Sequence, residues 1–194
     1  MHRKALVFRL SWGLAGVLSM GATAWAGELG GFDQTLRLRG VGFRVQSANA
    51  SVPGTLRVEP SGLSVDNAVQ ERPIPGRVES ALVADLNRDG SPELYVVVRG
   101  EPPRTEGALV AFSANRRKSL SDITVPALQD TPGAAAGYRG HDRFSVAGGA
   151  VVRRFPVYRD GAPDDRPSGH RRIVYRLKAG EASWQLVVVR VAKD

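Results

Sequence analysis

Residues 78–98 read VESALVADLNRDGSPELYVVV and place two apolar segments on either side of a short acidic loop. The first segment, 78–84, leads into the loop, and the second, Leu94 to Val98, is continuously apolar and rich in β-branched residues. Such a run is typical of a β-strand that is covered on both faces. The stretch therefore predicts two strands joined by the acidic loop.

Most of the remaining chain favours further short strands, because apolar and polar residues alternate along it. Residues 72–76, RPIPG, are expected to break the chain, Gly148-Gly149 to form a hairpin, and residues 113–140 to form a connection with one turn of helix near 126–128. The predicted fold is all-β, an antiparallel β-sandwich or barrel-like sheet of about eight to ten short strands. The further expected strands are 36–39, 41–45, 55–59, 63–65, 107–112, 144–146, 150–158, 172–177 and 184–189.

The first 26 residues have the three parts of a secretory signal. A basic start is followed by an apolar run from 10 to 20 and by Ala24-Trp25-Ala26, which fits a cleavage site. An uncleaved anchor is the alternative, but the apolar run is shorter than the roughly 20 residues that span a bilayer. We therefore predict a signal peptide over 1–26, a single β domain over 27–194, a periplasmic or secreted location and no membrane anchor after cleavage.

The charge and the absence of cysteine narrow the classes of protein further. The chain has no cysteine, so its stability must come from burying a core rather than from disulfides. Loss of the leader would reduce the formal net charge from +8 to +5, because the leader carries three basic residues and no acid. The basic residues are dispersed rather than clustered with aromatic residues, so nucleic acid is not an expected partner.

A group of arginines in the C-terminal half is the strongest basic feature. Arg153-Arg154, Arg171-Arg172 and Arg176 would form a stripe if their strands are neighbours. Arginine matches carboxylates well, so such a stripe could dock an acidic patch of another protein. The alternative is a solvated face paired with the domain's own acids. The loop from Asp160 to Gly169 is a second candidate contact surface, or a flexible solvated turn.

The acidic loop is the sharpest local motif. Its oxygen-bearing side chains alternate along the chain and a glycine, Gly90, follows the third, as in loops that wrap calcium. Val96 occupies the position where an EF-hand has glutamate, and strands rather than helices flank the loop. The segment instead resembles the calcium loops of FG-GAP propellers, although here it occurs once. The alternative is an Asp-Gly hairpin turn whose acids accept backbone hydrogen bonds. The candidate calcium ligands are Asp85, Asn87, Asp89 and Glu93.

No catalytic site is predicted from the residues. His141 and Asp142 suggest general base catalysis, but neighbours on a strand point to opposite faces. His170 is the one other histidine after the leader, which is too few for a zinc site, and no G-x-S-x-G motif is present. The protein is therefore expected not to be an enzyme, with a hydrolase that uses His141 and Asp142 as the weakest alternative.

Residues 78–99, with VADLNRDGSPEL at their centre, resemble the periplasmic inhibitors of invertebrate-type lysozyme. Four later segments are similar to a longer branch of exported proteins grouped with these inhibitors: SANRRKSL at 113–120, GYRGHD at 137–142, RRFPVY at 153–158 and GEASW at 180–184. The resemblance covers most of the chain from residue 72 onward.

The resemblance implies an antiparallel β-sandwich that inhibits lysozyme by inserting a Ser-Gly-x-Tyr loop into the catalytic cleft. Counting without gaps places this inhibitory loop at Pro103, Arg104, Thr105 and Glu106, just before Gly107, and neither the serine nor the tyrosine is present. Glu106 would then supply an anionic contact. We therefore predict a protein-binding domain that inhibits a lysozyme. The alternative is a calcium-stabilised interaction module of the cell envelope with no lysozyme target.

Overall fold

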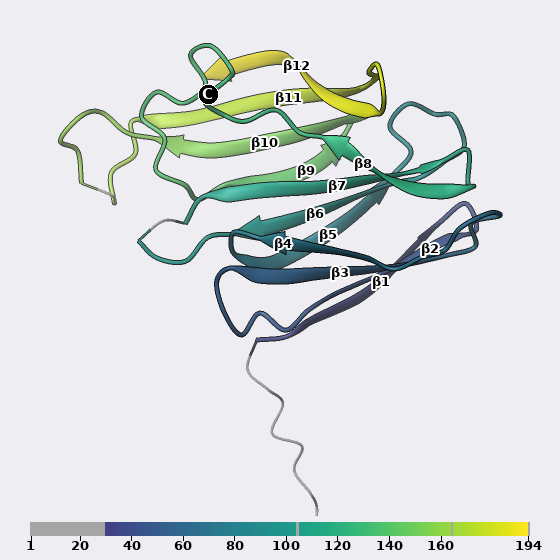
Figure 1. The fold of residues 1–194 in the computed structure, drawn as a ribbon. Helices are drawn as coiled ribbons and strands as arrows, with labels where there is room; N and C mark the ends of the chain where they lie inside the picture. The colour runs from purple at the N-terminus through teal and green to yellow at the C-terminus, as the bar shows by residue number, and fades with distance from the viewer. Residues whose placement is uncertain (1–29, 104, 164, 194) are drawn as a thin grey trace, which may run out of the picture.

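The computed structural model describes residues 30–103, 105–163 and 165–193, which form twelve β-strands and no helix (Figure 1). The all-β prediction is confirmed. The predicted signal peptide, residues 1–26, lies outside the described residues, as does Arg104. Within the described ranges, no segment forms a helix with the length and apolar character needed to cross a membrane.

Strands β1 to β4 form an antiparallel four-stranded sheet, which we call the small sheet, in the order β1-β2-β3-β4 (Figure 1). The alternation predicted for this part of the chain is observed, because Val41, Phe43 and Val45 are fully buried on one face. The strands are β1 (Phe32–Leu38), β2 (Val41–Ser47), β3 (Gly54–Ser61) and β4 (Gln70–Ile74).

The other eight strands form the large sheet, in the order β5-β6-β7-β8-β12-β11-β10-β9. Its edge strands β5 and β9 contact each other, so the sheet curves almost into a barrel. All pairs are antiparallel except β8 with β12, which departs from the purely antiparallel prediction. The strands are β5 (Arg77–Ala84), β6 (Glu93–Arg99), β7 (Gly107–Asn115), β8 (Ser119–Thr124), β9 (Arg143–Ala147), β10 (Ala150–Val157), β11 (Gly169–Ala179) and β12 (Trp184–Lys193).

Strand β6 lies between two hydrophobic cores, and this position explains why its sequence is continuously apolar. Leu94, Val96 and Val98 pack toward the small sheet, and Tyr95 faces the interior of the curved large sheet. All of these side chains are fully buried. The prediction that this strand is covered on both faces is confirmed.

Two predictions in the small sheet are wrong. Residues 63–65 form no strand, because the backbone N–H groups of Ser64 and Val65 donate to carbonyls of the β7–β8 turn instead of to a neighbouring strand. The side chain of Val65 is 74% exposed. The expected break at 72–76 begins inside β4. Pro73 is tolerated there because β4 is an edge strand, where a missing N–H donor costs little.

The segment from 113 to 140 also differs from the prediction. It contains β8, whose sequence SLSDIT has only two apolar residues and therefore gives little periodic signal. The helical turn expected near 126–128 is replaced by isolated turns, such as the bond from the Asp130 N–H to the Ala127 carbonyl at 3.2 Å. The Gly148-Gly149 hairpin is confirmed between β9 and β10, with both glycines at positive φ.

The hydroxyl of Tyr95 gives a first testable prediction. It is buried and has no hydrogen-bond partner in the described part of the chain, and burial raises the pKa of this phenol. Tyr95→Phe is therefore expected to leave stability unchanged or to raise it by up to about 1 kcal/mol. Tyr138→Phe, which removes bonds to Asp142 and Arg153, is expected to cost about 1–3 kcal/mol. Urea unfolding measures the change in the free energy of unfolding for both variants. A clear loss of stability in Tyr95→Phe would contradict the prediction.

Candidate functional site

The predicted inhibitory loop lies in the connection between β6 and β7, which we call the β6–β7 loop and of which the structure describes residues 100–103, 105 and 106 (Figure 1). Pro103 and Glu106 are exposed, Thr105 is half-buried, and Gly107 is buried as the first residue of β7. The Gly100 N–H donates to the Glu106 carbonyl at 2.9 Å and closes the base of the loop.

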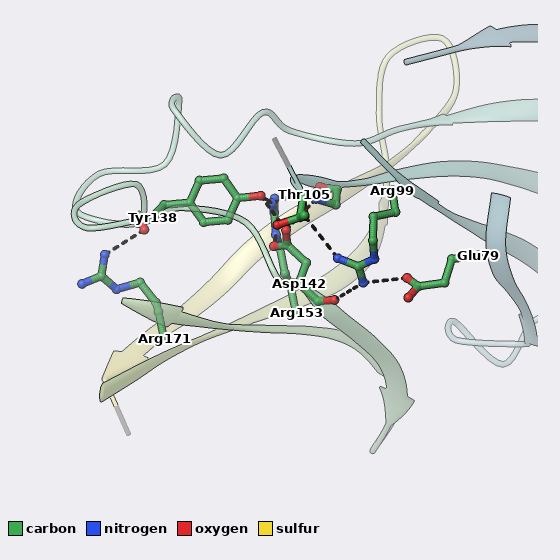
Figure 2. Close-up of polar contacts among 9 residues, drawn as sticks. Glu79, Arg99, Thr105, Tyr138, Asp142, Arg153 and Arg171 are labelled. Carbon is green, nitrogen blue, oxygen red and sulfur yellow. Dashed lines mark hydrogen bonds and ion pairs between the residues drawn. The ribbon is translucent and has the colours of Figure 1, made fainter. Parts of the chain in front are cut away.

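A buried ion pair holds the end of this loop. The carboxylate of Asp142 is inaccessible to solvent, and its Oδ1 accepts a hydrogen bond from Arg153 Nε at 2.6 Å. Its Oδ2 accepts bonds from the Gly107 N–H at 2.6 Å and from the Tyr138 hydroxyl. Arg153 Nη2 also donates to the Gly107 carbonyl at 3.1 Å. We call Tyr138, Asp142 and Arg153 the clamp, because together they bind both backbone groups of Gly107 (Figure 2).

Arg99, the last residue of β6, extends the clamp toward the loop. Its Nη1 donates to the Thr105 carbonyl at 3.2 Å, and its Nη2 donates to the Asp142 carbonyl and to Glu79 Oε2, both at 2.6 Å (Figure 2). The His141 N–H donates to the same Thr105 carbonyl at 3.1 Å. The loop is therefore fixed at Thr105 and Gly107, while the prolines before them are exposed.

The sequence of the clamp meets tight steric and electrostatic demands. A Cβ atom on Gly107 would lie 2.5 Å from the Cβ of Asp142, so only glycine fits there. Burial opposes the charge of Arg153, but the adjacent Asp142 carboxylate keeps the pKa of this arginine above its ordinary value. Burial, together with the bond to Asp142, raises the pKa of Tyr138. The clamp is thus a charged pair with a neutral phenol as its third member.

The acidic loop lies at the opposite end of β6 and brings the predicted ligands together. Asp85, Asp89 and Glu93 each place a carboxylate oxygen within 4.8 Å of the others. The fourth predicted ligand, Asn87, donates from its amide to Asp89 Oδ2 at 2.9 Å.

The hairpin-turn alternative for the acidic loop is also realised, because its acids accept backbone hydrogen bonds. The donors are the N–H groups of Gly90 to Asp85, of Ser91 to Asp89 and of Leu86 to Glu93. Glu93 is fully buried, and this burial, with smaller contributions from Asp85 and Asp89, raises its pKa to about 8.

His141 and Asp142 are not partners. His141 is exposed and has a positive φ of 62°, whereas the Asp142 side chain turns inward and gives both its oxygens to the clamp and to Gly107. Among the described residues no hydrogen bond joins their side chains. The two side chains diverge, so the hydrolase alternative lacks the catalytic pair on which it depends.

The strands that carry the predicted arginine stripe are neighbours, and Arg154 on β10 pairs in register with Arg172 on β11, both of them exposed. Arg153 points into the large sheet, and Arg171 donates to the carbonyls of Gly133, Ala134 and Ala136 at 2.7 to 3.0 Å. Arg176 donates to the Gly149 carbonyl at 2.9 Å. Arg153, Arg171 and Arg176 thus bind groups of the domain itself, which favours the alternative of a face satisfied within the domain over a docking stripe. The loop from 160 to 169 is mostly exposed and lies at the same end as the β6–β7 loop (Figure 1).

The clamp is the part of the candidate site that the sequence analysis did not predict. One signal for it was present, since Arg153 shares a strand face with Val151, Phe155 and Val157, all of which are buried. A charged residue on an apolar face requires a buried partner. The sequence does not show which acid that partner is.

Comparison of the chain with protein-family models, with curated proteins and with solved structures found no match.

Proposed function

We propose that this domain is an exported protein-binding module that presents the β6–β7 loop to its partner, and that the partner is a lysozyme. The observation that carries the proposal is the clamp. Its buried charged groups bind the backbone of Gly107 at the end of an exposed loop. A buried ion pair adds little stability compared with apolar packing, so it is better understood as a positioning device. A loop held in one conformation loses less entropy on binding.

The surface beside the loop suits insertion into a partner's cleft. Among the described residues of the loop, the exposed ones are Glu101, Pro102, Pro103 and Glu106. A groove beside it is lined by Glu101, Leu128 and Tyr138, among other residues. The β6–β7 loop could enter a cleft of the partner, and the groove beside the loop could accommodate one wall of that cleft. The sequence resemblance to lysozyme inhibitors supports the choice of a lysozyme as the partner.

Inhibition assays test this proposal. The chain from 27 to 194 is assayed against purified invertebrate-type, chicken-type and goose-type lysozymes, and we expect inhibition of the invertebrate type at micromolar concentration or below. Arg104→Ala with Glu106→Ala should weaken inhibition by about 30-fold or more if these side chains are central to the interface. Glu181→Ala, an exposed acid in the β11–β12 turn, is the matched control. Absence of inhibition of all three lysozymes at micromolar concentration would refute the lysozyme assignment.

A second candidate function is an interaction module of the cell envelope that calcium stabilises and that has no lysozyme target. The cluster of Asp85, Asp89 and Glu93 favours it. The two candidates differ in a simple way. Both would lose thermal stability on chelation if the acidic loop binds calcium, but a module of this kind would leave every lysozyme active.

A further inference from the structure

Two carboxylate oxygens in the acidic loop are buried without any hydrogen-bond partner in the described part of the chain. They are Oδ1 of Asp85 and Oε1 of Glu93. The Asp85 side chain is 6% exposed and Glu93 is fully buried. Buried polar groups are nearly always bonded, and a buried carboxylate oxygen without a partner is costly. Both carboxylates therefore have an unused acceptor atom that a bound ligand could satisfy.

The other oxygen of each carboxylate is already held in place. Asp85 Oδ2 forms an ion pair with Arg39, whose Nε lies 2.9 Å away, and it accepts a hydrogen bond from the Gly90 N–H at 3.1 Å. Glu93 Oε2 accepts the Leu86 N–H at 2.8 Å. Each carboxylate is thus fixed through one oxygen and has its other oxygen without a hydrogen-bond partner, and contacts of this kind orient metal ligands in proteins.

We propose that Asp85, Asp89 and Glu93 bind a calcium ion. The three candidate ligand atoms are all oxygens, which favours a hard cation over zinc or copper. They lie within 4.8 Å of one another. Ligands on opposite sides of Ca²⁺ are about 4.6–5.2 Å apart, so one ion can contact all three with little movement. Mg²⁺ would draw opposite ligands to about 4.2 Å and demands a more regular geometry.

The site connects the two sheets. Arg39 lies in the turn between β1 and β2 of the small sheet, and it reaches across to Asp85 at the start of the acidic loop of the large sheet. The ion pair is with Oδ2, and Oδ1 has no hydrogen-bond partner among the described residues. Arg39 is therefore a positioning residue for the site, and calcium is expected to stabilise the contact between the sheets as well as the loop.

Glu93 could also be buried because its carboxyl group is protonated rather than bound to calcium. A calcium titration separates these two explanations. The chain from 27 to 194 is stripped with a chelator, and its melting temperature is measured with Ca²⁺ or Mg²⁺ at about 10 mM. This concentration is about 100 times a dissociation constant typical of extracellular calcium modules, so Ca²⁺ should raise the melting temperature by about 5–10 °C. Mg²⁺ should raise it less, and an equal shift with Mg²⁺ would overturn the assignment to calcium.

Three variants make the test specific. Asp89→Asn keeps an exposed side chain of the same size and should abolish the shift, whereas Asp160→Asn, in the exposed β10–β11 loop, should retain it. Glu93→Gln preserves a carbonyl that can accept the Leu86 N–H and should also abolish it.

Binding is measured directly with Tb³⁺, whose luminescence is excited through the protein's aromatic side chains and should be displaced by Ca²⁺. The proposal is overturned if the unmodified chain shows neither a thermal shift nor Tb³⁺ luminescence, or if Asp89→Asn responds as the unmodified chain does. Because the readouts involve no lysozyme, they are independent of the proposed binding function.

Discussion

Asp142→Ala is expected to lower the free energy of unfolding by about 3–5 kcal/mol, because it leaves Arg153 buried and charged without its counter-ion. Arg153 is only 7% exposed, so water cannot replace the lost carboxylate. The same change removes the acceptor of the Gly107 N–H and of the Tyr138 hydroxyl. The loss therefore combines an unpaired charge with two unsatisfied donors.

Denaturant unfolding measures this loss, and thermal unfolding should show a decrease of about 10 °C. The matched control is Asp33→Ala, since Asp33 also accepts bonds from an arginine, Arg44, at 2.7 and 3.0 Å, but with both side chains about half exposed. Removal of an exposed pair changes stability little. Equal effects of the two variants would show that the clamp contributes no more than a surface ion pair.

Adding Arg153→Met to Asp142→Ala separates stability from positioning. The double variant no longer buries an unpaired charge, so part of the lost stability should return. The backbone of Gly107 would still lack the partners that hold it. If the clamp positions the loop, any lysozyme inhibition should stay lost while stability recovers. Recovery of both together would assign the clamp a purely structural role.

Local patterns in the sequence predicted the strands that carry strong apolar signals. The continuous run in β6 indicated burial on both faces, and Gly148-Gly149 indicated the β9–β10 hairpin; both are observed. Strands β4 and β8 were missed, because the first contains a proline and the second only two apolar residues. Their positions follow from the sheet around them rather than from their own sequence.

The acidic loop and the clamp also differ in how far the sequence predicts them. The spacing of oxygen-bearing residues in the acidic loop is local, so the sequence alone grouped three carboxylates that the structure places together. The clamp depends on contacts between residues far apart in the chain, because Asp142 lies 35 positions after Gly107 and Arg153 lies 46 positions after it. A single sequence carries no pattern that reports such a separation.

The segment that carries Tyr138 and Asp142 reaches the clamp by way of Gly137, which packs directly against the end of β10. Its carbonyl accepts the Tyr158 N–H at 2.9 Å, and Tyr138 forms a bridge with Val157. A Cβ atom on Gly137 would lie 2.3 Å from the Tyr158 carbonyl oxygen, which belongs to the backbone and cannot turn aside. Its φ of 72° adds the cost of a left-handed conformation.

Gly137→Ala is therefore expected to cost about 3 kcal/mol or more, as the sum of a left-handed conformation and a backbone clash. Gly133→Ala is a closely matched control, because Gly133 has nearly the same φ, 69°, but has no atom within 4 Å of the added Cβ. It should cost only about 1 kcal/mol. Urea unfolding of both variants isolates the clash as their difference. Relief of the clash would displace Tyr138 and Asp142, so Gly137→Ala should also weaken any inhibition. Equal losses of unfolding free energy in the two variants would show that the backbone of this segment moves to relieve the clash. Its contact with β10 would then not be what fixes the clamp.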